Sequence, residues 1–176
     1  MSTKSYIGLS LMVCHIILFV IWSKILIPKE MHVSKLEYDK KLYYQDQPKN
    51  FSEKEIDCLA ENIFHEAGTE SVHGKLAVAQ VTYNRLSLGK WGKNVYDVVY
   101  ANNQFSWTKK KKQECSGPLW EESKEVAVLF NQGLKSKIIK DATHYHADYI
   151  EPPKWSKKYD KVAKIGKHKF YREVDS

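Results

Sequence analysis

The sequence predicts an α+β domain that is predominantly helical, carries a small β element and follows one N-terminal transmembrane helix. Three patterns indicate this: an uncharged apolar run near the start, a strong helical period that begins at Ser52, and an alternation of apolar and polar residues in IGKHKFY near the end. With 176 residues, the chain is long enough for one domain with a core and too short for two of ordinary size.

The apolar run is long enough to span a bilayer as a helix. Residues 5–23 carry no formally charged side chain, and the apolar sequence resumes after Lys24. A cleaved signal peptide is the alternative, but no small-x-small cleavage site follows the run. We therefore expect residues 1–27 to be an uncleaved signal anchor, residues 28–51 to be a tether without a sustained apolar period, and residues 52–176 to be the folded domain.

The charges beside this span conflict with an external position of the domain. Lys24, Lys29 and Lys35 follow the span, whereas only Lys4 and the terminal amine precede it. The positive-inside rule alone would keep the domain in the cytoplasm, but long domains can translocate regardless of local charge. The flanking charges therefore do not decide the topology, and the location of the substrate has to be used instead.

The domain is mildly basic, because residues 51–176 contain 21 basic and 17 acidic side chains. Such a balance suits an anionic polymer, although a solvated surface is the commoner explanation. The chain has only two arginines, Arg85 and Arg172. Nucleic-acid-binding proteins rely on arginine for bidentate contacts to bases and phosphates. We therefore expect no nucleic-acid partner.

Cys58 and Cys115 are the only cysteines outside the apolar run. If the domain is exported, we expect a disulfide between them that ties the first helix to the loop after QFSW. Two buried thiols are equally compatible with the spacing.

The strongest helix prediction covers residues 52–67. Ser52 and Glu55 form a capping box, Gly68 stops the helix, and apolar residues recur at helical spacing between them. Glu66 falls at the edge of the apolar stripe and His65 on the opposite, wet side. Partial desolvation and the negative helix end would raise the pKa of Glu66, as a general acid requires. The alternative is a rim glutamate whose aliphatic stem covers the stripe.

The later segments are predicted in less detail. Residues 72–88 are expected to form a central buried helix, with Asn84 and Arg85 at its end bracing a neighbouring loop. Residues 89–118, including VYDVVY, look rich in loops, and a helix is expected from Trp120 to about Leu134. The segment DATHYHADYIEPPKW has no period and is interpreted as a shaped loop.

A zinc peptidase is one alternative function, because His144 and His146 have H-x-H spacing. The zinc motifs are incomplete, however. Thr69 stands where H-E-x-x-H needs its second histidine, and Gln80 stands where a D,D-carboxypeptidase-like pattern needs aspartate. We expect neither a metal ion nor another cofactor.

Aromatic residues beside amides indicate a carbohydrate groove, since sugar rings stack on aromatic faces and hydrogen-bond to amides. Core packing is the alternative for each aromatic residue taken singly. A wall-binding module that uses the aromatic residues without catalysis is therefore a further alternative function.

Five ordered stretches, CLAENIFHEAGTES, GKLAVAQVTYNR, VVYANNQFSW, ATHYHADYIEPPKW and KVAKIGKHKFYR, resemble the SleB/CwlJ-type cell-wall hydrolases. The resemblance covers about residues 55–172. It implies a lysozyme-like or lytic-transglycosylase-like fold and cleavage of peptidoglycan glycan strands. It also implies that Glu66 is the catalytic glutamate. The residues that it places in the substrate groove are Gln104, Phe105, Tyr145, His146, Trp155 and Tyr171.

These expectations combine into a monomeric peptidoglycan glycosidase of lytic-transglycosylase type, anchored in the inner membrane by its N-terminal helix and facing the periplasm. Its layout equally fits a phage lysis enzyme. A hydrolytic route would need a second carboxylate, for which Glu70, Asp141 and Asp148 are the candidates. None of them is clearly placed beside Glu66 by the sequence, so we prefer a route that uses one acid.

Overall fold

The computed structural model describes residues 42–110 and 114–174. The expected signal anchor, residues 1–27, and most of the expected tether lie outside these ranges. None of the helices in the described part of the chain combines the length and the apolar character that a membrane crossing requires.

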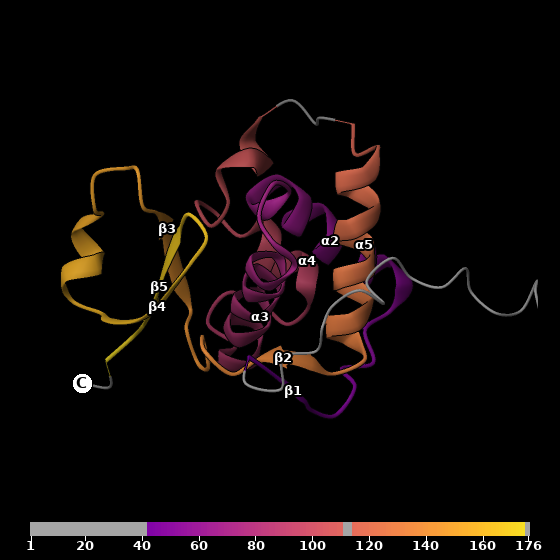
Figure 1. Ribbon diagram of the computed structural model, residues 1–176, viewed down its shortest axis with the longest axis horizontal. Helices are drawn as coiled ribbons and strands as arrows, with labels where there is room; N and C mark the ends of the chain where they lie inside the picture. Colours follow the sequence, from indigo (N-terminus) through magenta and orange to yellow (C-terminus); the bar gives the residue numbers. More distant parts are fainter. Residues whose placement is uncertain (1–41, 111–113, 175–176) are drawn as a thin grey trace, which may run out of the picture. The chain divides into compact units, whose positions relative to one another are not determined.

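Four helices form the larger part of the described domain (Figure 1). They are α2 (Glu53–Ala67), α3 (Val72–Leu88), α4 (Val95–Tyr100) and α5 (Pro118–Asn131). The predicted helices at residues 52–67 and 72–88 are confirmed. At the start of α2, the Ser52 side chain accepts from the Glu55 backbone N–H, and the Glu55 carboxylate accepts from that of Ser52. These bonds satisfy backbone donors that a helix start leaves open.

Helix α3 is central because its residues enter two apolar clusters. Leu76 and Ala79 pack into a cluster with buried residues of α2, α4 and α5. Ala77 and Val81 pack into a second cluster, which includes Phe170 of the C-terminal sheet. A helix that is buried around most of its circumference cannot show a one-sided apolar stripe, which agrees with the small and apolar residues on several of its faces.

The segment between α3 and α5 is more helical than the sequence indicates. VYDVVY forms α4, whose N-cap Asn94 accepts a hydrogen bond from the Asp97 backbone N–H. Helix α5 starts at Pro118, at a position that tolerates the missing proline N–H, and ends at Asn131. The expectation of a helix that reaches about Leu134 was therefore wrong at its end, where Leu134 begins a strand.

A short two-stranded sheet attaches the end of the expected tether to the domain. Strand β1 (Tyr43–Gln45) pairs antiparallel with β2 (Leu134–Ser136). Between α5 and β2, Gly133 has φ +106°, and a Cβ atom there would lie 2.1 Å from the Asp46 carbonyl oxygen. Residues 43–45 thus belong to the folded domain, which begins before residue 52.

The second sheet has the antiparallel order β3-β5-β4. Its strands are β3 (His144–Ala147), β4 (Asp160–Ile165) and β5 (His168–Arg172), drawn in orange to yellow in Figure 1. The strand predicted from IGKHKFY is present as β5, and Gly166, with φ +53°, makes the turn that precedes it. Strand β3 lies inside the segment interpreted as a shaped loop, so that interpretation was wrong for these four residues.

Candidate active site

Glu66 lies in the last turn of α2, where its Oε2 accepts a 2.9 Å hydrogen bond from the hydroxyl group of Tyr145. Tyr145 comes from β3, in the sheet that packs against α3. The side chain of Tyr145 lies beside those of His168 and Phe170, with ring centroids 5.2 and 5.6 Å apart. The helix and the sheet therefore meet at the carboxyl group of Glu66.

A pocket of about 350 Å³ opens at this contact. Among its lining residues, Glu66 is the only one with a carboxyl group. The other polar groups are amides, hydroxyls and cations, which can hydrogen-bond to a sugar. The lining residues are Glu66, Arg85, Asn103, Gln104, Ser106, Lys109 and Tyr145.

The surroundings of Glu66 raise its pKa above the ordinary value of a glutamate. Burial raises the pKa of Glu66, while the hydrogen bond from Tyr145 and the charge of Arg85 act in the opposite direction. Burial, followed by the nearby Glu66 carboxylate, raises the pKa of Tyr145 well above its ordinary value. Tyr145 therefore keeps its proton and acts as a hydrogen-bond donor to Glu66.

Two residues at the end of α3 hold the chain segment that leads into β3. Asn84 Nδ2 donates to the carbonyl groups of Lys140 and Ala142, at 2.9 and 2.8 Å. Arg85 Nε donates to the Thr143 carbonyl at 2.7 Å. The prediction that Asn84 and Arg85 brace a neighbouring loop is confirmed, and the braced loop is the one that positions Tyr145.

Arg85 also faces the pocket wall. Its guanidinium group lies 5.2 Å from the ring centroid of Phe105, and the side chain is buried. Its Nη1 is buried without a hydrogen-bond partner in the described part of the chain. This donor therefore lies unpartnered behind the pocket wall, while other atoms of Arg85 line the pocket beside Glu66.

Sequence reasoning did not identify Asn62, which is fully buried in α2. Its Nδ2 donates to Thr82 Oγ1 at 3.1 Å, and its Oδ1 accepts from Trp107 Nε1 at 3.0 Å. The Trp107 ring stacks on His65, with centroids 4.3 Å apart and planes inclined by 22°. His65 is therefore half-buried, with one face of its ring covered by Trp107, and is less exposed than expected. The available signal was an amide next to Ile63 on an apolar helix, because a buried amide needs partners.

The residues expected in the substrate groove occupy three places. Gln104 and Tyr145 line the pocket with Glu66. Phe105 is 2% exposed and belongs to the core, so it supports the pocket wall and cannot be a direct substrate contact. His146, Trp155 and Tyr171 form a separate cluster, in which the hydroxyl group of Tyr171 and His146 Nε2 lie 3.1 Å apart.

The separation follows from strand geometry. Successive side chains of a strand point to opposite faces of its sheet, so Tyr145 and His146 cannot line the same surface. Strand β3 turns Tyr145 toward α2, whereas His146 stacks on Tyr171 with centroids 5.4 Å apart. The residues expected in the groove therefore lie in a pocket at Glu66 and in an aromatic cluster on the other face of the sheet, and their roles as substrate contacts stay predictions.

The two histidines considered for a zinc peptidase pack against aromatic side chains. His144 lies against Trp155 and Tyr159, with centroids 5.2 and 4.7 Å away. Burial, assisted by the charge of Arg85, lowers the pKa of His144 to about 4. In the described ranges, the one group of three side chains able to hold a metal ion is Glu61, His65 and Cys115, which includes neither His144 nor His146.

The candidates for a second carboxylate also lie outside the pocket. Glu70 approaches the backbone N–H of Lys167 at 3.4 Å, and Asp148 pairs with Lys164 at 2.6 Å. Asp141 lies 3.7 Å from Arg172, in a pocket beside the C-terminal strand. None of these three carboxylates therefore lies beside Glu66, where a hydrolytic reaction would need a base.

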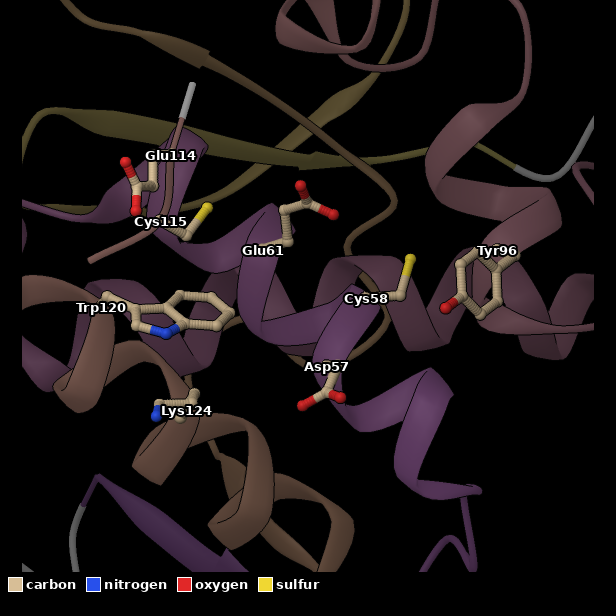
Figure 2. A pocket seen from close by; sticks show the side chains of 8 residues that line it. All are labelled: Asp57, Cys58, Glu61, Tyr96, Glu114, Cys115, Trp120 and Lys124. Carbon is tan, nitrogen blue, oxygen red and sulfur yellow. The ribbon is translucent and has the colours of Figure 1, made fainter. Parts of the chain in front are cut away.

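A larger pocket, of about 740 Å³, lies on another face of α2 (Figure 2). It contains both cysteines of the domain, and the structure has them as thiols. The expected disulfide is therefore not formed. The reason is orientation: Cys58 is turned into the core at 2% exposure, and Cys115 Sγ lies 3.8 Å from His65 Nε2.

Replacing Tyr145 by phenylalanine is expected to raise the pKa of Glu66, because the lost hydrogen bond favoured the carboxylate. The alkaline limb of the pH–activity profile should move to higher pH, because Glu66 keeps its proton longer. The measurement is glycan cleavage across a pH series.

The matched control is Tyr149→Phe, since Tyr149 is 77% exposed and does not line the pocket. Its profile should coincide with that of the unmodified protein. An unmoved alkaline limb in a folded Tyr145→Phe variant would remove Tyr145 from the control of Glu66.

Comparison with known proteins gives one family and two similar folds. Residues 69–171 match the family model described as Cell Wall Hydrolase. The catalytic domain of the Bacillus cereus SleB protein is 22% identical in sequence to this chain and superposes with a TM-score of 0.57. The alignment covers 72% of this chain and 95% of that domain. The catalytic domain of the germination-specific lytic transglycosylase SleB from Bacillus anthracis is 22% identical, with a TM-score of 0.59 and coverages of 71% and 99%. No curated protein matched.

At these identities the two structures establish a likeness of fold alone. The family match begins just after Glu66. The role of Glu66 therefore has to be argued from its surroundings.

Proposed function

This chain belongs to the cell wall hydrolase family, as its resemblance to SleB/CwlJ-type enzymes implied, and we propose that it cleaves peptidoglycan as a lytic transglycosylase. The bond is the one between N-acetylmuramic acid and N-acetylglucosamine, and Glu66 is the general acid and base. The fold likeness to two SleB catalytic domains is compatible with this reaction.

The observation that carries the proposal is the position of Glu66. It lines a pocket of otherwise neutral or cationic groups, hydrogen-bonded to Tyr145 at 2.9 Å and with its pKa raised by burial. Glycosidases that use water generally need two carboxyl groups beside the scissile bond. A pocket lined by one carboxyl group favours a reaction in which the substrate supplies its own nucleophile.

The proposed reaction uses Glu66 twice. Its carboxyl group donates a proton to the glycosidic oxygen as the bond to C1 of N-acetylmuramic acid breaks, and N-acetylglucosamine leaves with a free hydroxyl group. Positive charge develops at C1 and the ring oxygen. The C6 hydroxyl group of the same muramic acid then attacks C1, and its proton returns to the Glu66 carboxylate. The product is a 1,6-anhydro sugar, and the acid is regenerated without water.

The remaining groups of the pocket suit a sugar substrate. Asn103, Gln104 and Ser106 offer amide and hydroxyl groups to the pocket, and Arg85 and Lys109 add cationic groups. These groups can bind the hydroxyl and acetamido groups of a glycan and exclude water from C1.

Digestion of purified peptidoglycan is expected to release muropeptides that end in 1,6-anhydro-N-acetylmuramic acid. These products are lighter by one water than the products of hydrolysis, so mass spectrometry separates them. A sole product with a reducing N-acetylmuramic acid would overturn the single-acid route. Released peptides with intact glycan strands would instead favour the zinc-peptidase alternative built on His144 and His146.

The proposal includes tethering to the inner membrane through residues 1–27, with the domain in the periplasm where peptidoglycan lies. Its support is the uncharged apolar run at residues 5–23 together with the wall substrate of the family. A reporter enzyme that works only outside the cytoplasm should be active when fused to the C-terminus, and one that works only inside should be inactive. Activity of a cytoplasmic reporter would contradict this topology. The same layout remains compatible with a phage lysis enzyme.

A further inference from the structure

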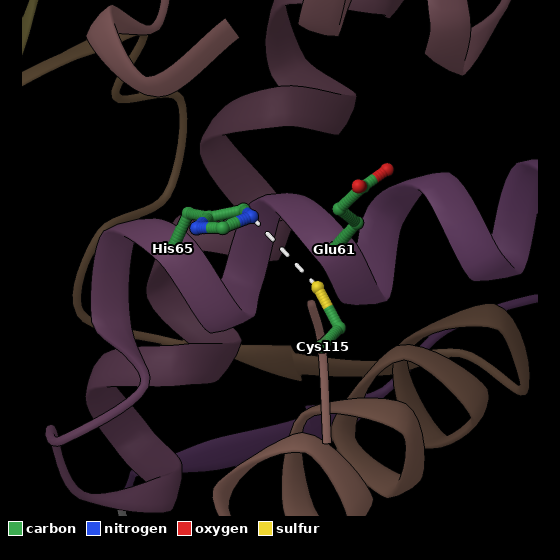
Figure 3. Close-up of side chains that lie close together, drawn as sticks. All are labelled: Glu61, His65 and Cys115. Carbon is green, nitrogen blue, oxygen red and sulfur yellow. Dashed lines mark hydrogen bonds between the residues drawn. The ribbon is translucent and has the colours of Figure 1, made fainter. Parts of the chain in front are cut away.

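A second cluster of reactive side chains lies at the edge of the larger pocket, which two of its three members, Glu61 and Cys115, line. Glu61 and His65 are four residues apart on α2, so they lie on one face of the helix. Cys115 reaches them from the segment that precedes α5. One ligand atom from each of the three residues lies within 4.8 Å of the other two (Figure 3).

The distances in this cluster fit a shared ion. Tetrahedral bonds of about 2.3 Å to sulfur and about 2.0 Å to nitrogen hold two ligand atoms about 3.5 Å apart. Cys115 Sγ and His65 Nε2 are already 3.8 Å apart. These two atoms therefore need to approach by only about 0.3 Å to share a metal ion, and the Glu61 carboxylate, within 4.8 Å of both, closes the remaining gap by turning its side chain.

The ligand types select the class of ion. Thiolate, imidazole and carboxylate together suit Zn²⁺ and related transition metals, whereas Ca²⁺ and Mg²⁺ require oxygen ligands. Asp57 and Glu114 also line the pocket, and Lys124 is its basic lining residue. This lining has more carboxylates than cationic groups, which favours the entry of a cation.

We propose that Glu61, His65 and Cys115 form a binding site for a divalent transition metal of the Zn²⁺ type, separate from the catalytic pocket. Binding replaces the thiol proton of Cys115, which leaves to solvent, by a sulfur–metal bond. The three side chains leave the fourth position of a tetrahedral ion open. This site is independent of the proposed glycan cleavage.

A cysteine nucleophile activated by histidine is the competing interpretation of the same pair. In such a relay, one ring nitrogen faces the sulfur and the other is oriented by an acidic group. In Figure 3 the ring nitrogen that faces Cys115 is also the one on the Glu61 side, and the second nitrogen points away from Glu61. Convergence on one nitrogen fits a common ion and not a relay.

A bound ion would join two parts of the catalytic domain. His65 precedes Glu66 directly and stacks on Trp107, which belongs to the loop that lines the catalytic pocket. Cys115 stands at the far end of that loop, just before α5. The ion would therefore fasten the loop to the helix that carries Glu66, and it would stabilise the folded domain by binding it in preference to the unfolded chain.

Metal titration of the full chain in detergent tests the site, with Zn²⁺ in competition with a chromophoric chelator. The unmodified protein should bind a single Zn²⁺ ion, and Co²⁺ in its place should give a near-ultraviolet charge-transfer band from the thiolate. Cys115→Ser should abolish that band and weaken Zn²⁺ binding by at least about a hundredfold. Mutation of residues that only hydrogen-bond to metal ligands already lowers metal affinity by about 10–100-fold, and the loss of a ligand should cost at least as much. Glu61→Gln should weaken binding and keep the band.

The matched control is Cys58→Ser, because Cys58 lines the same pocket but is not among the three converging side chains. It should retain both Zn²⁺ affinity and the Co²⁺ band, with circular dichroism verifying the fold of each variant. The proposal is overturned if the unmodified protein fails to bind Zn²⁺, if Co²⁺ gives no thiolate band, or if folded Cys115→Ser binds Zn²⁺ like the unmodified protein.

Discussion

Replacing Glu66 by glutamine is expected to lower the rate of glycan cleavage by at least about a hundredfold, the usual scale of general acid catalysis. The amide keeps the shape of the side chain and can still accept the hydrogen bond from Tyr145. It can neither donate a proton to the glycosidic oxygen nor take one from the attacking hydroxyl group. The measurement is the initial rate of muropeptide release from purified peptidoglycan.

Glu70→Gln is the matched control, because Glu70 is a neighbouring glutamate that does not line the catalytic pocket. Its rate should stay near that of the unmodified protein, whereas a large loss would make Glu70 the missing second carboxylate. Near-normal cleavage by folded Glu66→Gln would remove Glu66 from the mechanism. Retained binding of Glu66→Gln to peptidoglycan, with cleavage lost, would exclude the alternative of a non-catalytic wall-binding module.

Replacing Phe130 by alanine is expected to lower the free energy of unfolding by about 3–5 kcal/mol. Phe130 in α5 is fully buried in the cluster that joins α5 to α2 and α3. Its ring meets that of Tyr83 edge to face, with centroids 5.7 Å apart. Truncation removes apolar contacts and leaves a cavity beneath the helix that carries Glu66. Denaturant unfolding followed by circular dichroism measures the loss.

Leu88→Ala provides the comparison, because Leu88 is 52% exposed at the end of α3. Its effect should stay within about 0.5 kcal/mol, as for other surface substitutions. A loss below about 1 kcal/mol for Phe130→Ala would contradict the packing of α5 against α2 and α3.

Local sequence was sufficient where local bonds define an element. The capping box of Ser52 and Glu55 and the apolar period behind it identify α2 within one residue of its ends. The same period places Glu66 at the edge of the buried stripe, and burial does raise its pKa. IGKHKFY likewise identifies β5, because its alternation matches a strand with one buried face.

Elements that depend on distant partners could not be predicted in this way. HYHA becomes β3 because β5 supplies its hydrogen bonds, and Tyr43 to Gln45 form a strand because β2 lies beside them. VYDVVY is too short for a helical period to be recognised, although Asn94 caps it. The sequence carries the residues for these elements, but their partners are far along the chain.

The features of the candidate site likewise differ in whether they depend on neighbouring residues or on distant ones. The sequence by itself determined that Glu66 would end an amphipathic helix at a core boundary, because helix periodicity depends only on neighbouring residues. Only the tertiary structure decided that the hydroxyl group of Tyr145 lies 2.9 Å from Glu66, that His146 faces the opposite side of the sheet, and that Cys115 meets His65 instead of Cys58. Those contacts join residues separated by 25 to 79 positions, and their geometry depends on how helices and sheet pack.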